Sequence, residues 1–136
     1  MKSIWNWFRR TTPQETELKG APVRVRTKTY SAETGYVYQY VFRGYRSIPD
    51  QAGTQFVFET SHDRKEHFDL VVHLLDSALA ECAGRIGREI LDAERYALAK
   101  LNLFQTFDHL DPGNRPGISI PDAGQMEEYL RVLGRI

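Results

Sequence analysis

The sequence predicts an α+β domain in which a small antiparallel sheet packs against helices. Two segments rich in β-branched and aromatic residues, 23–31 and 36–46, flank a turn-like stretch at 32–35. A third segment, 54–60, alternates apolar and polar residues, and the proline-free stretch 63–110 carries apolar residues at steps of three and four. Because a sheet and a helix that each have one apolar face bury it against one another, these patterns favour a three-stranded meander on a helical layer.

The composition is that of one globular domain. The chain has 136 residues, of which 41% are hydrophobic and 26% charged, a size that buries a substantial core. The single cysteine, Cys82, lies within the apolar helical stripe, so we expect it to pack in the core. A lone cysteine is typical of a reducing compartment, and we expect a cytoplasmic protein.

The amino-terminal part of the chain differs from the rest. We interpret residues 1–21 as a basic, aromatic tail and linker that precedes a single domain at 22–136. Trp5, Trp7 and Phe8 lie among basic residues and offer a weak contact with a membrane surface, although docking on the domain or on a second copy is favoured. Residues 1–30 carry seven basic and two acidic groups, a charge of +5, and the remaining residues carry −5. This asymmetry is compatible with an anionic partner or self-association, but charges that cancel within the fold are the favoured interpretation.

The hairpin allows two registers. A four-residue loop pairs Ser31 with Tyr36 and Thr29 with Tyr38, and a five-residue loop shifts this pairing by one. The five-residue loop would place several charges of strand 23–31 beside the aromatic row, so we expect the four-residue loop. One face then gathers the residues that should meet the helices: Val23, Val25, Tyr36, Tyr38, Tyr40 and Phe42, joined by Phe56 and Phe58 of the third strand.

The opposite face of this sheet is the main candidate binding surface. It would gather four basic residues and one aromatic ring: Arg24, Arg26, Lys28, Tyr30 and Arg43. Basic groups beside a ring can hold phosphates while the ring stacks on a base. The RNA-recognition signature is absent, and any half-buried sheet has an exposed polar face. A solvated or protein-contacting face is therefore favoured over nucleic-acid binding.

The long apolar stripe predicts helices. Asp63 and Glu66 resemble a capping box, so a helix should begin there. Continued to Leu110 it would be about 70 Å long at ~1.5 Å per residue, too long for a domain of this size. We expect two helices, broken between Gly84 and Asp92; an unbroken helix would have to bury its overhang in a dimer.

A weak metal site and a last helix complete the reading. On a helix, Asp69, His73 and Asp76 would share one side, but their spacing matches no standard metal site, so no metal or other cofactor is expected. A final helix should begin after Asp122, with an apolar stripe formed by Met126, Tyr129, Leu130 and Leu133.

Function is predicted only in outline. No nucleophile with an adjacent base and no glycine-rich phosphate loop is present in the sequence. We therefore expect a non-enzymatic protein-interaction module of unknown partner, with a homodimer as one possible form. Binding of nucleic acid or another anionic surface through the basic sheet face and the tail is the alternative. A metal-dependent enzyme is the second alternative.

Overall fold

The computed structural model describes residues 17–110 and 117–136 and confirms the α+β class. The described residues form five strands and three helices: β1 (Lys28–Ser31), β2 (Val37–Ser47), β3 (Gly53–Ser61), β4 (Phe68–Leu75), α3 (Asp76–Ile86), α4 (Asp92–His109), β5 (Ile118–Ser119) and α5 (Ala123–Val132). The strands form one sheet in the order β1-β2-β3-β4-β5, antiparallel except for the parallel pair of β4 and β5.

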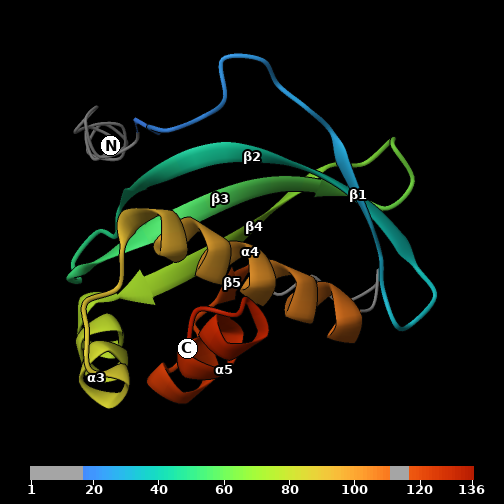
Figure 1. The fold of residues 1–136 in the computed structure, drawn as a ribbon. Coiled ribbons are helices and arrows are strands. Elements are labelled where there is room, and N and C mark those ends of the chain that lie inside the picture. Colours follow the sequence, from blue (N-terminus) through green and yellow to red (C-terminus); the bar gives the residue numbers. More distant parts are fainter. Residues whose placement is uncertain (1–16, 111–116) are drawn as a thin grey trace.

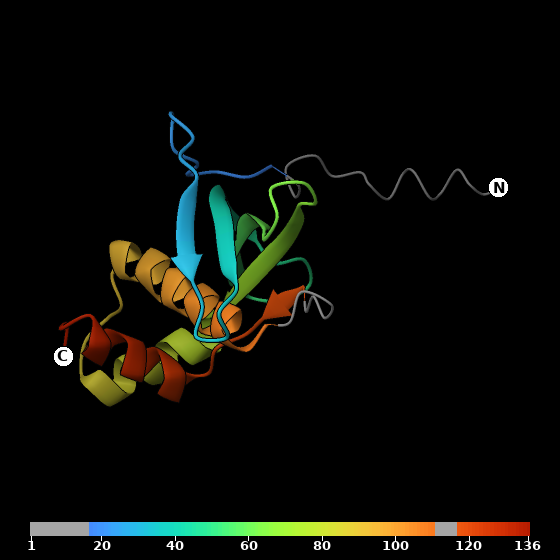
Figure 2. The ribbon, with the colours of Figure 1, turned by 90° about the vertical axis from the view of Figure 1, so that its right-hand side faces the viewer.

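The core lies between the curved sheet and α4. Strands β2 to β4 arch over α4 (Figure 1), and the view from the side shows α3 and α5 packed beyond it (Figure 2). Phe107 of α4 is fully buried and stacks on Tyr38 with ring centroids 4.6 Å apart. Phe56 and Phe58 are buried in the same core, which confirms the predicted face of β3. Aromatic rings of β2 and β3 therefore share one core with α4.

The hairpin between β1 and β2 has the register that the sequence argument rejected. Ser31 pairs with Val37 and Thr29 with Gln39, so five residues separate the strands. Gly35 adopts a φ of +96° and its N–H donates to the carbonyl of Ala32, the geometry of a turn followed by a glycine bulge. This bulge adds the residue that the four-residue loop lacks, and the predicted pairing is wrong by one position.

The one-residue shift changes which side chains face the core. Tyr30 faces the helices instead of solvent, whereas Val23, Val25 and Tyr36 are 107%, 55% and 46% exposed rather than buried. No cation is buried by this register because the sheet begins only at Lys28. The argument against the five-residue loop failed because it assumed that the strand extends back to residue 23.

The first part of the predicted helical stretch is a fourth antiparallel strand. β4 pairs with β3 along its whole length, for example Val72 with Phe56, so the predicted helix start after Asp63 is wrong. Asp63 does accept two backbone N–H groups, from Lys65 and Glu66, as the capping pattern suggested. These bonds close the turn between β3 and β4 instead of starting a helix. They also lower the pKa of Asp63 to about 2.

The predicted break between two helices is confirmed. α3 ends at Ile86, and Gly87 follows in the left-handed conformation with a φ of +81°, its N–H donating to the carbonyl of Ala83. α4 begins at Asp92. Cys82 is fully buried on α3, as expected, and burial raises its pKa.

A buried carboxylate joins α4 to the carboxyl-terminal end. Glu94 is 4% exposed and accepts two hydrogen bonds from the guanidinium of Arg88, at 2.9 and 2.8 Å, and one from Nε of Arg135 at 2.9 Å. It also accepts the backbone N–H of Leu91 at the start of the helix. Chiefly because of Arg88, the pKa of Glu94 falls to about 2. Glu94 therefore connects the start of α4 to Arg88 and Arg135.

The last helix agrees with the prediction in most details. Asp122 caps α5 by accepting the N–H of Gln125. Met126, Tyr129 and Leu130 are buried against α3 and α4, whereas Leu133, the last member of the predicted stripe, is 38% exposed. The short strand β5 precedes this helix.

Candidate functional site

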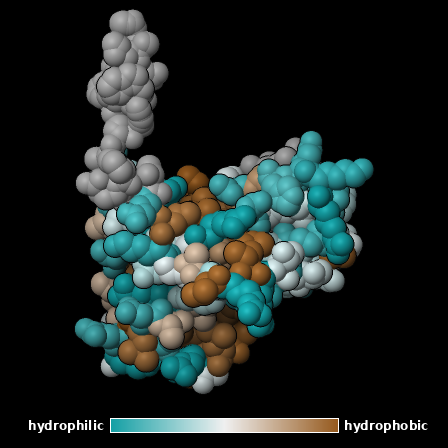
Figure 3. Space-filling model, turned by 90° about the horizontal axis from the view of Figure 1, so that it is seen from above, coloured by the Kyte–Doolittle hydropathy of each residue, from teal (hydrophilic) through white to brown (hydrophobic). Residues whose placement is uncertain are grey.

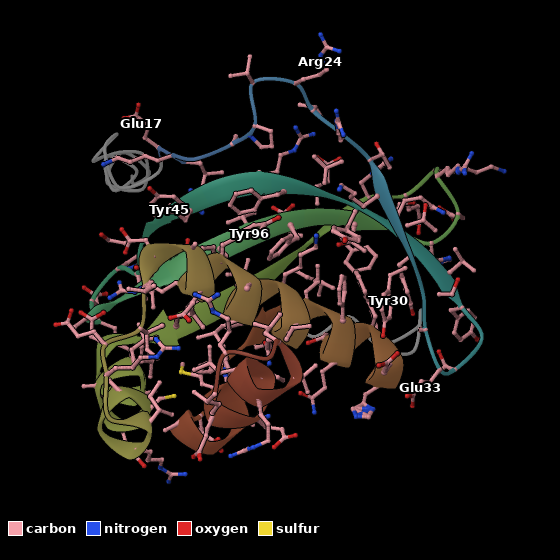
Figure 4. The ribbon with its side chains drawn as sticks, in the orientation of Figure 1. Glu17, Arg24, Tyr30, Glu33, Tyr45 and Tyr96 are labelled. Atoms are coloured by element: carbon pink, nitrogen blue, oxygen red, sulfur yellow. The ribbon has the colours of Figure 1, made fainter. Side chains whose placement is uncertain are left out.

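The structure separates the five predicted binding residues. Arg24 and Arg26 lie in an exposed segment that leads into β1, and Lys28 is the first residue of that strand. Figure 4 shows Arg24 pointing away from the body of the protein, whereas Tyr30 points toward the end of α4. Arg43 lies on the opposite face of the sheet from Tyr30. Arg24, Arg26 and Lys28 therefore follow one another along one segment. Tyr30 and Arg43 lie elsewhere, on opposite faces of the sheet.

Tyr30 has a structural role. Its ring stacks on Phe104 with centroids 4.4 Å apart, and its hydroxyl donates to the carboxylate of Asp108 at 3.0 Å. The same carboxylate accepts the backbone N–H of Glu33 at 3.0 Å. Burial, together with the hydrogen bond to Asp108, raises the pKa of Tyr30 to about 12. The ring is occupied in the core, and Asp108 fixes the β1–β2 hairpin to α4.

Arg43 is neutralised on the outer face of the sheet. Its guanidinium donates to Glu59, which also lies 3.2 Å from Nδ1 of His67. A second polar row crosses three strands on this face, with Arg46 donating to the Oε1 of Gln55 and the Nε2 of Gln55 lying 3.0 Å from the Nε2 of His73. These contacts pair the polar groups of the outer face with one another, so this face does not present a row of unpaired cations.

The outer edge of β1 is open. Within the described part of the chain, β1 pairs with β2 alone. The N–H of Ala32 donates to the carbonyl of Tyr36, and in an antiparallel pair the hydrogen-bonded positions alternate. Lys28 and Tyr30 therefore bond to β2, whereas the backbone groups of Thr29 and Ser31 point toward the open edge.

Basic residues line the approach to this edge. We call the open side of β1 together with Arg24, Arg26 and Lys28 the basic edge. None of these three side chains forms a salt bridge with a described residue, and all three are exposed. Figure 3 shows hydrophilic residues covering much of the surrounding face, with hydrophobic groups between them. Lys100 of α4 is close enough that, besides burial, the charge of Lys28 lowers its pKa.

The weak metal candidates are not brought together as the helical pattern implied. Asp69 and His73 lie on β4, and Asp76 is the first residue of α3. Four residues along a strand span about 13 Å, compared with about 6 Å along a helix. Among residues 17–110 and 117–136 no group of three or more His, Cys, Asp or Glu side chains could hold a metal ion. Burial lowers the pKa of His73, which favours its neutral form.

Among the hollows lined by described residues, two lie between α4 and the sheet. One, of about 280 Å³, is lined by the aromatic rings of Phe42, Tyr45, Phe56 and Tyr96 near the start of the helix. The other, of about 290 Å³, lies between α4, α5 and the paired strands β4 and β5. Sequence reasoning missed both, because each is assembled from residues far apart in the chain whose local patterns indicate only core positions.

Comparison with known proteins adds no further assignment. No family model, no curated protein and no solved structure matches this chain. Among the described helices, none combines the length and the apolar character needed to cross a bilayer. The proposed membrane contact by Trp5, Trp7 and Phe8 falls outside the described residues.

Proposed function

We propose that the protein is a non-enzymatic interaction module that binds an extended acidic segment of a partner protein along the basic edge. The observation that carries the proposal is the open edge of β1, where Thr29 and Ser31 direct backbone groups outward. Such an edge can accept an additional strand, whose main-chain hydrogen bonds supply affinity.

The charges of the basic edge determine the chemistry of the partner. Arg24 and Arg26 lie in the exposed segment that leads into β1, and Lys28 is its first residue, so an acidic segment of a partner would be attracted to this edge. Two copies of the segment 24–28 carry the same charge and would repel one another if they lay side by side. The charges therefore favour a different protein over self-association through this edge.

The anchoring of the hairpin supports a preformed site. Asp108 holds both Tyr30 and the backbone of Glu33, so the hairpin is attached to α4 before any partner arrives. A strand that is already ordered loses little conformational entropy when it binds, and this improves affinity. The lone buried cysteine agrees with a cytoplasmic site of action, which we include in the proposal.

Binding of single-stranded nucleic acid is the competing function. The basic edge and Lys100 supply cations for phosphates, and Nζ of Lys100 lies 6.0 Å from the ring centroid of Tyr96. Tyr30, the ring predicted to stack on a base, is instead stacked on Phe104. Because the Tyr30 ring packs on Phe104, it is not presented for stacking on a base. We therefore rank strand addition above nucleic-acid binding.

Two variants separate these functions. Thr29→Pro removes an outward N–H without removing a bond to β2, and Thr29→Val retains that N–H as the matched control. Arg26→Glu reverses one charge at the basic edge, and Lys65→Glu makes the same change in the exposed turn between β3 and β4. Fluorescence anisotropy would measure binding of a labelled peptide that alternates glutamate and valine, and of a labelled single-stranded RNA.

Strand addition predicts that the peptide binds, that Arg26→Glu weakens it about threefold and that Thr29→Pro weakens it about tenfold. Both control variants should bind like the wild-type protein. Strong RNA binding with a steep salt dependence that is unchanged in Thr29→Pro would instead support the nucleic-acid function. Absence of peptide binding at low salt would contradict the proposal, as would a stable dimer in sedimentation that Arg26→Glu strengthens.

A further inference from the structure

The hollow of about 280 Å³ near the start of α4 is lined by a row of rings. We call it the aromatic hollow, and its described lining includes Phe42, Tyr45, Phe56 and Tyr96. The ring centroid of Phe42 lies 4.9 Å from that of Tyr96 and 6.3 Å from that of Phe56. The row continues with Tyr45, whose ring lies 5.8 Å from Phe56. Phe56 is buried, whereas Tyr45 is 39% exposed, so one end of the row reaches solvent.

A bulge in β2 brings Tyr45 into this row. The pairing of β2 with β3 shifts between Phe42 and Gly44, so Arg43 is an extra residue in the strand. In a regular strand, residues three apart point to opposite faces of the sheet. The extra residue instead turns Tyr45 to the same side as Phe42. The exposed ring at the hollow is therefore a consequence of the bulge.

The described chain begins beside this hollow. The N–H of Lys19 donates to the carbonyl of Tyr45 at 2.9 Å, and the N–H of Tyr45 donates to the carbonyl of Lys19 at 2.8 Å. Gly20 lines the hollow, and a Cβ there would lie 2.5 Å from the Tyr45 ring. Figure 4 shows Glu17 near Tyr45, and both residues line one neighbouring hollow. The point where residues 1–16 join the domain is therefore fixed at the aromatic hollow.

Residues 1–16 have the side chains and the length to fill it. They include both tryptophans of the protein, Trp5 and Trp7, and also Phe8. Phe8 lies nine residues before Glu17, and nine residues of extended chain span about 30 Å, so these rings can reach the hollow. A short tether gives an effective concentration of about 1 mM, so a contact with a dissociation constant of about 0.1 mM would be about 90% occupied.

The charges near the hollow agree with a basic occupant. Residues 1–16 carry three basic side chains and one acidic side chain. The side chain of Asp92 in the lining is exposed, and Asp76 and Glu89 line an adjacent hollow. Arg95 is the one basic residue in the described lining of these two hollows. Three acidic groups and one basic group therefore surround the place where a basic segment would lie.

We propose that the aromatic hollow holds segment 5–8 of the same chain, with the indole ring of Trp5 or Trp7 packed against Tyr45 and Tyr96. Aromatic rings pack favourably on one another when they are offset or edge to face, and the N–H of an indole at the open end of the row can remain in water. The tether favours this segment over the same segment of a second copy, because it is always present near the hollow.

Tryptophan fluorescence reports on this contact alone, because both tryptophans of the protein lie in segment 5–8. The emission maximum and the quenching by acrylamide would be measured for the full chain, for Tyr45→Ala and for Tyr36→Ala. Tyr45 and Tyr36 are 39% and 46% exposed, so both variants should fold. Tyr36 does not belong to the described lining of the hollow, and Tyr36→Ala is therefore the matched control.

Docking predicts that the wild-type protein has blue-shifted emission and weak quenching. Tyr45→Ala removes one wall of the hollow and should weaken the contact about tenfold, which lowers its occupancy to about half. Its emission should therefore shift to the red and its quenching should increase, while Tyr36→Ala behaves like the wild-type protein.

Wild-type emission like that of tryptophan in water would overturn the proposal, as would equal effects of the two variants. A blue shift that disappears on dilution would place the segment on a second copy, and one that appears only with anionic lipid vesicles would place it on a membrane surface. Either result would also overturn the proposal. None of these outcomes depends on the basic edge.

Discussion

Glu94 gives the sharpest quantitative prediction about stability. The substitution Glu94→Gln keeps the shape of the side chain but removes the charge that Arg88 and Arg135 contact. The fall of its pKa from 4.5 to about 2 corresponds to roughly 3 kcal/mol at about 1.36 kcal/mol per unit. The side chains of Arg88 and Arg135 are 36% and 50% exposed, so water screens part of this interaction. We therefore expect a loss of about 2 kcal/mol at pH 7.

The pH dependence identifies the origin of this loss. Because the pKa of Glu94 is lower in the folded protein, its contribution is fully present above pH 4.5 and is lost as the pH falls toward 2. Urea unfolding of the wild-type protein and of Glu94→Gln should therefore differ most near neutral pH and converge in acid. Glu89→Gln, which changes an exposed carboxylate nearby, is the control and should alter stability by less than about 0.5 kcal/mol. A difference that is the same at pH 7 and pH 2 would refute this reasoning.

Three further substitutions test the packing. Tyr30→Phe removes the donor to Asp108 and should lower the free energy of unfolding by about 1 kcal/mol in urea titrations, and an unchanged value would show that the hairpin needs no anchor. Phe107→Ala empties a fully buried site and should cost about 3–5 kcal/mol by thermal unfolding, whereas a cost below about 1 kcal/mol would contradict the stacked core. Gly44→Ala places a methyl group 2.5 Å from the carbonyl of Lys19 at a φ of +120°, so it should destabilise by at least about 1 kcal/mol and speed amide exchange at Lys19; wild-type exchange there would count against this contact.

Glycines and caps made part of the fold predictable from sequence. Gly87 ends α3 in the left-handed conformation, although Gly84 lies within that helix, and Asp122 caps the last helix as its pattern indicated. These features depend on residues close together in the chain, so local chemistry decides them.

The missing strand shows why periodicity misled elsewhere. Residues 68–75 form a short apolar run in which Phe68, Val72 and Leu75 fit helical spacing, while Leu70, Val72 and Leu74 fit a strand with one buried face. Periodicity cannot separate a short buried strand from a helix, and pairing with β3 decided the outcome. The hairpin register was wrong for a different reason: the turn with its bulge at Gly35 takes five residues, and β1 begins at Lys28 instead of residue 23.

The candidate sites were predictable only in part. Arg24, Arg26 and Lys28 were identified from their charge and remain exposed, but the role of Tyr30 required the correct register. The two hollows beside α4 are lined by helices and strands that lie far apart in the chain. No local pattern in the sequence contains that information.

Amide hydrogen exchange tests the proposed strand addition most directly. Thr29 and Ser31 direct their N–H groups to the open edge, whereas Lys28 and Tyr30 bond to β2. Adding the peptide of alternating glutamate and valine should slow exchange at Thr29 and Ser31 and leave Lys28 and Tyr30 nearly unchanged. Slowed exchange at none of these positions, or at all of them equally, would contradict binding along the edge of β1.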